Sequence, residues 1–227
     1  MRENIKINDV GEILNEVKSW IIKHRETFFT VCIITLLVIG FTIYFFVHYF
    51  SIQHKAFEKL SFGQGYAYAG INDQAIKIFD EIINNYPKSK PVDYAKLYKA
   101  DILYYMNNFQ EANKLYDNII KESKNKIVLP FAYIGSGICN ENIGNYSQSI
   151  KIYLEFIDRF PEHFLLPRVY ESLARVYSLS GSIEQSKNTY EKIITLFPGT
   201  MYAKKAQNEL NIILQQKNVP SNQNKNK

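Results

Sequence analysis

The residues that could carry out chemistry are few and widely separated in this sequence. Gly135-Ser136-Gly137 resembles part of a nucleophile elbow, in which a serine sits on a strand-to-helix turn, but no strand-like segment precedes it. We favour packing over catalysis there, because the tripeptide falls in a helical segment that needs small side chains. The stretch Phe62-Gly63-Gln64-Gly65 lacks both the strand and the lysine of a phosphate-binding loop.

Residues of the types that bind metals also lack the spacing of a metal site. The four histidines are dispersed, at His24, His48, His54 and His163. No His-x-x-x-His pair and no Cys-x-x-Cys occurs. The adjacent carboxylates Asp80 and Glu81 point in different directions on a helix and belong to a solvated face. The sequence therefore predicts a protein that is not an enzyme, with no cofactor, no metal ion and no small-molecule substrate.

A short pattern recurs with a fixed period of 37 residues. Its turn residues are Gly70, Asn107, Gly144 and Gly181; five positions on come Ala75, Ala112, Ser149 and Ser186; four further on come Phe79, Tyr116, Tyr153 and Tyr190. Prolines close three of the four units, at Pro87, Pro161 and Pro198, and Lys124 takes that place in the second unit. A fixed period of this length, with two helical segments in each unit, predicts a helical solenoid.

Each position in the pattern has a physical reason. Glycine, and after it asparagine, turns the chain between two antiparallel helices because a positive φ costs these residues little. The small residue lies where two helices approach closely, and the aromatic ring fills the space beside it. Proline lacks an N–H group and restricts the residue before it, so it ends the second helix of a unit.

Over roughly residues 56–215 the pattern resembles a tetratricopeptide-repeat array. The matching first-helix residues are Phe62, Gly63 and Tyr66 in the first unit and Leu173, Ala174 and Tyr177 in the fourth. The third unit departs from the family pattern with Asn140 where a tyrosine is expected, and the second has Leu103. The period of 37 exceeds the usual length of about 34, so we expect turns between repeats that are about three residues longer.

We expect an all-α fold with one transmembrane helix, an α-solenoid of about four helix hairpins and a C-terminal capping helix. First helices are predicted at 51–69, 91–106, 130–143 and 167–180, second helices at 73–86, 110–122, 147–160 and 184–197, and the capping helix at 203–216. The predicted division is an N-terminal segment 1–26, a membrane helix 27–50, a repeat domain 51–216 and a disordered polar tail 217–227.

The membrane helix is predicted from residues 27–47, which hold 21 residues without a charge. At 1.5 Å per residue this run is long enough to cross a bilayer. A cleaved signal peptide is not expected, because the apolar core is too long and starts far from residue 1. Before it, residues 10–22 have helical apolar spacing and include Trp20, which indicates an amphipathic helix at the membrane surface or, equally, a short solvated helix.

Charge sets the expected orientation and excludes one class of partner. Five basic residues precede the apolar run, and only Lys55 and Lys59 follow it closely. The amino end should therefore be cytoplasmic and the repeats periplasmic or otherwise extracytoplasmic. Residues 51–217 hold 20 Lys and Arg against 17 Asp and Glu without a basic cluster, which argues against nucleic-acid binding. Cys32 and Cys139 are not expected to pair, so cysteine usage does not identify the redox compartment.

The concave face of such an array is lined by the first helices, and we expect a partner protein to bind there. The repeat register predicts that its lining residues include Tyr94, Leu97, Asp101, Tyr104, Tyr105, Phe131, Ile134, Ile138, Arg168, Glu171 and Arg175. Tyrosine and arginine are the residues that most often anchor protein contacts. An alternative is that several of these aromatic residues only pack against the preceding helix.

The order of segments is similar to that of the ancillary Sec-translocon subunits of the bacterial inner membrane. The phrases Tyr86-Pro87-Lys88-Ser89 and Phe197-Pro198-Gly199-Thr200 also resemble repeats of that family and of envelope-assembly proteins. The resemblance implies a non-catalytic scaffold in the inner (cytoplasmic) membrane whose partners are translocon subunits, chaperones or exported proteins. A scaffold for envelope assembly or cell division, and a structural subunit that oligomerises through its membrane helix, are the alternatives.

Overall fold

The computed structural model describes residues 7–218, with the side chains of residues 11–215. Within that range every helix is an α-helix and there is no strand, in agreement with the predicted fold class. The chain divides into two compact units, Met1–His54 and Lys55–Lys227.

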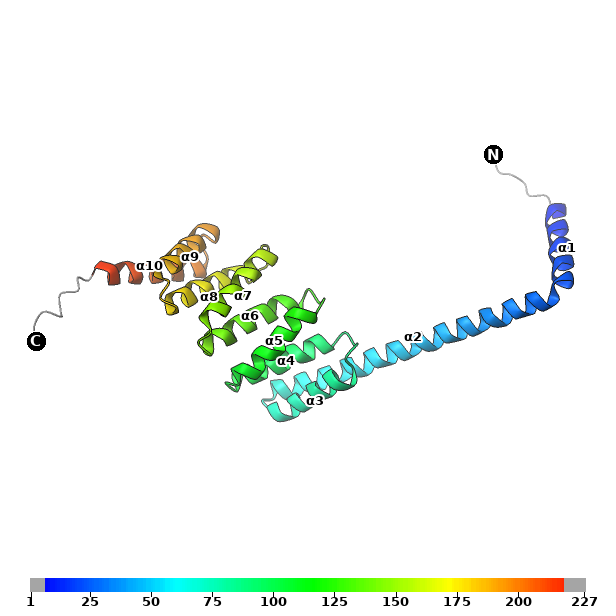
Figure 1. Ribbon diagram of the computed structural model, residues 1–227, viewed down its shortest axis with the longest axis horizontal. Coiled ribbons are helices and arrows are strands. Elements are labelled where there is room, and N and C mark those ends of the chain that lie inside the picture. The colour runs from blue at the N-terminus through cyan, green and yellow to red at the C-terminus, as the bar shows by residue number, and fades with distance from the viewer. Residues whose placement is uncertain (1–6, 219–227) are drawn as a thin grey trace, which may run out of the picture. The chain divides into compact units, whose positions relative to one another are not determined.

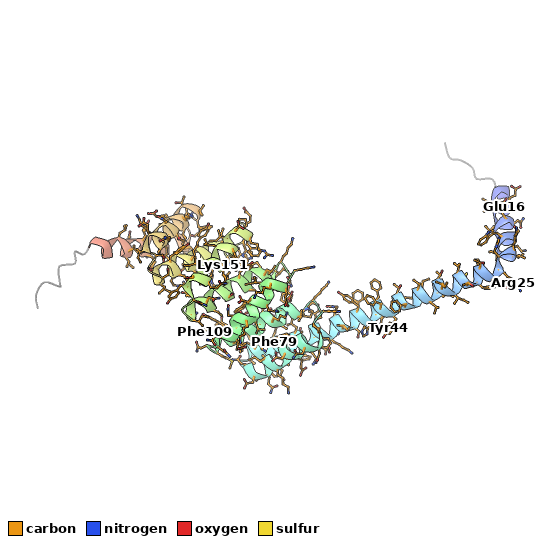
Figure 2. All side chains as sticks on the ribbon, viewed as in Figure 1. Glu16, Arg25, Tyr44, Phe79, Phe109 and Lys151 are labelled. Atoms are coloured by element: carbon orange, nitrogen blue, oxygen red, sulfur yellow. The ribbon has the colours of Figure 1, made fainter. Side chains whose placement is uncertain are left out.

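The first unit contains α1 (Ile7–Lys23) and most of α2 (Arg25–Tyr68). α1 covers the predicted segment 10–22, and its exposed apolar side chains are Ile13, Leu14, Val17, Trp20 and Ile22, with Trp20 54% exposed. α2 joins the segments predicted as 27–50 and 51–69 into one helix. It is the one helix of the described residues that is long and apolar enough to cross a membrane, and none of that stretch is buried. In Figure 2 the side chain of Tyr44 projects from this part of α2.

The second unit continues from the end of α2 through eight more helices (Figure 1). These are α3 (Asn72–Asn85), α4 (Val92–Tyr105), α5 (Phe109–Glu122), α6 (Val128–Asn142), α7 (Tyr146–Arg159), α8 (Leu166–Leu179), α9 (Ile183–Leu196) and α10 (Met201–Asn218). Each helix from α3 onward packs on the next, and the first helices α4, α6 and α8 also contact one another in sequence. The predicted stack of helix hairpins is confirmed, and the helix bounds differ from the predicted ones by about two residues.

All four turns within the hairpins have the same backbone geometry. The turn residues Gly70, Gly144 and Gly181 have φ between 74° and 79°, and Asn107 has φ 61°. In each turn the following N–H donates to a carbonyl five residues back, as from Asn145 to Asn140 at 2.8 Å. This is a Schellman motif, which satisfies the last carbonyls of the first helix with main-chain atoms alone. The prediction of positive φ at these four positions is confirmed.

Close helix approach explains the small and aromatic positions. Ala75, Ala112, Ser149 and Ser186 are all fully buried. The hydroxyl of Ser149 donates to the carbonyl oxygen of Gly137 at 2.9 Å, and Ser186 bonds Ala174 in the same way at 2.8 Å. A Cβ on Gly137 would collide with the ring of Tyr153, which is itself fully buried. The hairpins are therefore held together by small residues that let a ring of the opposite helix lie against the backbone.

The third unit replaces the expected tyrosine with Asn140, which is 2% exposed. Its side-chain amide donates to Asn113 Oδ1 at 3.0 Å and to the carbonyl of Ser136 at 2.9 Å. The Ser136 hydroxyl is buried too and lies 2.8 Å from Asp117 Oδ1. The α5–α6 interface thus contains a hydrogen-bonded polar cluster where a ring was expected, and Ser136 serves this packing.

The second helices end at proline in three units and at polar side chains in the other. α5 is followed by Ser123, whose backbone is extended, and by Lys124 in the proline position. There the side-chain oxygen of Asn125 accepts a hydrogen bond from the N–H of Ile127 at 3.0 Å, so an asparagine turn leads into α6. α6 begins at Val128, two residues before the predicted start.

α10 caps the array through Ala203, Ala206 and Leu210, which are buried against α9 and α8. Leu214, one turn further along α10, is 40% exposed. The helix continues to Asn218, so residues 217 and 218 of the predicted polar tail 217–227 are helical, and residues 219–227 lie outside the described part of the chain. Residues 1–6 lie outside it as well.

Candidate protein-binding surface

The first helices α4 and α6, with the start of α8, enclose an open cavity of about 440 Å³, here called the α4–α6 cavity. Its lining consists of Tyr94, Leu97, Tyr98, Asp101, Tyr104, Tyr105, Tyr116, Ile127, Val128, Phe131, Ile134, Gly135, Ile138, Leu165 and Arg168. Nine of the eleven residues predicted from the repeat register are in this set. The register therefore located one continuous surface, although binding of a partner there stays a prediction.

Six aromatic rings line the α4–α6 cavity, four of them on α4. Tyr105 is 80% exposed and Phe131 is 40% exposed, so both rings are accessible to solvent. The Tyr104 and Tyr105 rings meet edge to face, with centroids 5.5 Å apart. Tyr94 and Tyr98 lie one helical turn apart on α4 and are half-buried. Such a surface offers large apolar contact area and hydroxyl groups that can bond a peptide backbone.

A carboxylate and a buried tyrosine form the polar part of the lining. The Tyr116 hydroxyl donates to Asp101 Oδ1 at 2.5 Å, and Tyr116 is only 2% exposed. Burial raises the pKa of Asp101 above its usual range, and the hydrogen bond from Tyr116 acts in the opposite direction. Burial also raises the pKa of the Tyr116 hydroxyl, so that it stays protonated and acts as the donor. A Cβ on Gly135 would collide with the Tyr116 ring, so the glycine is needed for this pair to form.

Two of the predicted residues lie outside the α4–α6 cavity and have charged partners. Arg175 on α8 pairs with both carboxylate oxygens of Glu141 on α6, at 2.6 and 2.9 Å. Glu171 on α8 pairs with Lys205 on α10. The first pair connects two adjacent first helices and the second connects the last first helix to the capping helix, so these side chains hold adjacent parts of the array together. Their role in partner binding stays a prediction.

The register missed lining residues of two kinds. Ile127 and Leu165 lie in the connections before α6 and α8, and a count of helix positions does not reach them. Tyr116 and Gly135 were assigned to packing alone, yet they also form the bottom of the lining. Tyr98 could have been found, because it lies four residues after Tyr94 on the same helix face.

No group of three or more His, Cys, Asp or Glu side chains that could hold a metal ion is found in the part of the chain that the structure describes. Cys32 and Cys139 are free thiols, and Cys139 is fully buried. His163 packs against Phe164, with ring centroids 4.5 Å apart, and burial lowers its pKa. Cys139 and His163 are parts of apolar contacts.

Family comparison agrees with this geometry. Models of the tetratricopeptide repeat match residues 60–89, 131–163 and 167–200. The chain contains tetratricopeptide repeats. The three matched segments correspond to the first, third and fourth hairpins, and the tetratricopeptide fold is a scaffold for contacts between proteins, with no catalytic family evident. A search of curated protein sequences finds no match.

Solved tetratricopeptide-repeat structures have the same fold. A MamA double mutant of strain RS-1 superposes with a TM-score of 0.60 at 18% identity, covering 73% of this chain and 86% of MamA. MamA from residue 41 onward, from Desulfovibrio magneticus RS-1, gives 0.59 at 18% identity, covering 72% and 85%. PilF of Pseudomonas aeruginosa gives 0.56 at 18% identity, covering 74% and 71%. At these identities the similarity establishes the arrangement of the repeats alone.

Proposed function

We propose that this chain is a membrane-anchored scaffold whose tetratricopeptide repeats hold a segment of another protein in the α4–α6 cavity. The observation that carries the proposal is the cavity itself. It combines exposed aromatic rings, a partly buried carboxylate and an arginine on adjacent first helices. Aromatic residues and arginine contribute most of the binding energy in typical protein interfaces. The repeats provide rigid helices on which such side chains are held in place.

Anchoring by α2 is supported by the side chains that it exposes. Leu36 and Leu37 are each 68% exposed, and Phe41 is 71% exposed. Contact of such a surface with water is unfavourable by about 25 cal/mol per Å² of apolar area. Insertion of residues 27–50 into lipid removes this cost, and the exposed Trp20 of α1 then suits the headgroup region.

A membrane anchor and a cleaved signal sequence predict different mature proteins. We expect the protein isolated from cells to retain residues 1–50 and to sediment with membranes after a carbonate wash. Intact mass spectrometry of the membrane fraction checks this. A soluble product that begins after residue 50 would contradict the anchor while leaving the repeat scaffold intact.

Orientation can be tested with a single added thiol. Asn208 on α10 is exposed, so Asn208→Cys should react with a membrane-impermeant maleimide in intact spheroplasts if the repeats are extracytoplasmic. The native Cys139 is a suitable silent background. It is fully buried, and burial together with the nearby Asp101 and Asp117 carboxylates raises its pKa to about 12. Labelling only after lysis would place the repeats in the cytoplasm.

Partner binding is tested by capture from detergent extracts. Tyr105→Ala removes a ring of the α4–α6 cavity that is 80% exposed, and Tyr68→Ala removes a ring elsewhere that is 98% exposed. We expect the first change to reduce recovery of the partner protein at least tenfold and the second to leave it unchanged. Equal recovery by both variants would show that the concave surface is not the binding site.

The identity of the captured proteins decides between narrower functions. Recovery of translocon subunits, chaperones or exported proteins supports an ancillary role at the Sec translocon, which the order of segments and the phrases at Tyr86–Ser89 and Phe197–Thr200 suggest. Recovery of envelope-assembly or division proteins supports the corresponding scaffold. Recovery of further copies of this chain alone supports a structural subunit that assembles through α2.

A further inference from the structure

The Asp101 carboxylate lines the α4–α6 cavity and accepts a hydrogen bond from the neutral Tyr116 hydroxyl. Among the described residues, Asp101 makes no ion pair, and Tyr116 is its one hydrogen-bond donor. The neighbouring lysines of α4 are engaged with other helices: Lys96 bonds Asn118 at 2.6 Å and Lys99 bonds Asp80 at 2.5 Å. A half-buried carboxylate with one donor is poorly compensated for the water that it has lost. The site is therefore complementary to a cation supplied from outside the chain.

The rings around Asp101 are suited to the same cation. Tyr94, Tyr98, Tyr104 and Tyr105 line the α4–α6 cavity on the helix that carries Asp101, and Phe131 lines it on α6. The face of an aromatic ring attracts an ammonium or guanidinium group within about 6 Å of its centre. This chain already makes such contacts internally, since the Arg159 guanidinium lies 5.9 Å from the Tyr133 ring centre.

We propose that the α4–α6 cavity binds a lysine or arginine side chain of an extended protein segment, with the Asp101 carboxylate pairing the cation and the surrounding tyrosine and phenylalanine rings enclosing its aliphatic stem. This inference rests on the proposed function and adds the chemistry of the partner. The volume of about 440 Å³ accommodates one long side chain with the backbone on either side of it.

Other occupants fit the same lining less well. An acidic side chain at this position would meet the Asp101 carboxylate, and like charges at close range repel. A purely apolar side chain would cover Asp101 without supplying a counter-charge, which leaves a desolvated carboxylate. Arg168 lies at the exposed start of α8, so anionic groups of the segment are directed to that edge and the cation to Asp101.

The test uses the full chain in lipid nanodiscs and a displayed library of random nonapeptides as the probe. We expect selected peptides to be enriched in Lys or Arg at one fixed position. A peptide in which that residue is replaced by norleucine should bind at least tenfold more weakly. Asp101→Asn, which keeps an acceptor for Tyr116, should weaken the basic peptide at least tenfold and leave the norleucine peptide nearly unchanged.

Two controls separate the possible failures. Asp73→Asn removes an exposed carboxylate on α3 outside the cavity and should not alter peptide affinity. If selected peptides bind and Tyr105→Ala releases them, but no basic residue is required, the cation proposal is overturned while the scaffold function stands. If no peptide binding depends on Tyr105, the proposed binding surface itself is wrong. The norleucine peptide needs no change in the protein, so a folding defect in Asp101→Asn cannot hide the result.

Discussion

The guanidinium of Arg175 on α8 donates a hydrogen bond to each carboxylate oxygen of Glu141 on α6, with Nε–Oε1 at 2.6 Å and Nη2–Oε2 at 2.9 Å. The hydrogen bonds with Glu141 raise the pKa of Arg175. The pair joins the third and fourth hairpins across the concave side, and Glu171 with Lys205 joins the fourth hairpin to the capping helix in the same way. These two ion pairs thus help to set the spacing of α6, α8 and α10.

Arg175→Gln should lower the free energy of unfolding by about 1 kcal/mol, because Glu141 would remain largely buried without its partner. This expected loss is small for a largely buried carboxylate because the Arg175 side chain is 43% exposed, so water partly screens the ion pair. Chemical unfolding of the full chain in detergent measures it. Lys205→Gln, at a more exposed pair, should cost less; an equal or larger loss would refute the argument from burial.

Gly137→Ala should destabilise the repeats by about 1–3 kcal/mol, since the added methyl group would overlap the buried Tyr153 ring. Gly65→Ala is the matched change in a helix with open space around the site, and it should stabilise by about 0.5–1 kcal/mol. Thermal unfolding followed by circular dichroism compares the two. The same sign of effect at both positions would show that close packing at Gly137 is unimportant.

Gly144→Ala should cost about 1–2 kcal/mol through backbone strain alone, because φ is 79° and no atom lies near the added methyl group. Asn107→Gly should change stability by less than about 0.5 kcal/mol, because Asn already tolerates φ 61° in the same turn. Urea unfolding midpoints measure both. A large loss at Asn107→Gly would instead indicate that the asparagine side chain is needed.

Asp101→Asn should raise stability at neutral pH. Burial raises the pKa of Asp101 in the folded chain, so the folded state binds the proton more tightly than the unfolded state does. The stability contributed by this carboxyl is full in acid and is lost as the pH rises through the raised pKa. The titratable groups that interact with Asp101 are the Tyr116 hydroxyl and the Cys139 thiol.

The difference in unfolding free energy between Asp101→Asn and the native chain should therefore decrease as the pH falls towards the ordinary carboxyl pKa. Unfolding midpoints between pH 3 and pH 8 measure the difference from the native chain, and Asp73→Asn, on the exposed surface, controls for the change in net charge. A difference that grows in acid would contradict a carboxyl whose charged form is disfavoured by burial. A gain in stability together with weaker peptide binding would show that Asp101 serves binding at the expense of stability.

The repeat period was enough to predict the hairpins because each recurring position is dictated by local geometry. Positive φ at Gly70 and burial of Ala75 follow from the turn and the close helix approach, and both are found. The polar cluster around Asn140 was not predictable, because its partners Asn113 and Asp117 lie on another helix and their pairing depends on tertiary packing.

The candidate surface was predictable where it follows helix register and not where it depends on loops or partners. Nine lining residues came from counting positions on the first helices. Ile127 lines the cavity because of the conformation of the segment between α5 and α6, which helix register does not predict. Arg175 was predicted to line the surface, but its ion pair with Glu141 was not predicted. A single sequence identifies which face a helix position occupies, but not which charge will find a partner within the chain.

Because the four Schellman turns are equivalent, a whole 37-residue repeat can be deleted between two of them without changing the sequence pattern of a turn. Each is closed by the same two main-chain hydrogen bonds, and the turn residues recur every 37 positions. Excising residues 144–180 would join Ile143 directly to Gly181, and the junction would reproduce the turn that was removed. Such a shortened chain would keep helices α4 to α6 and would test how few hairpins still fold. A deletion of this kind is possible because each repeat contacts only its neighbours, whereas a globular core has contacts between distant segments.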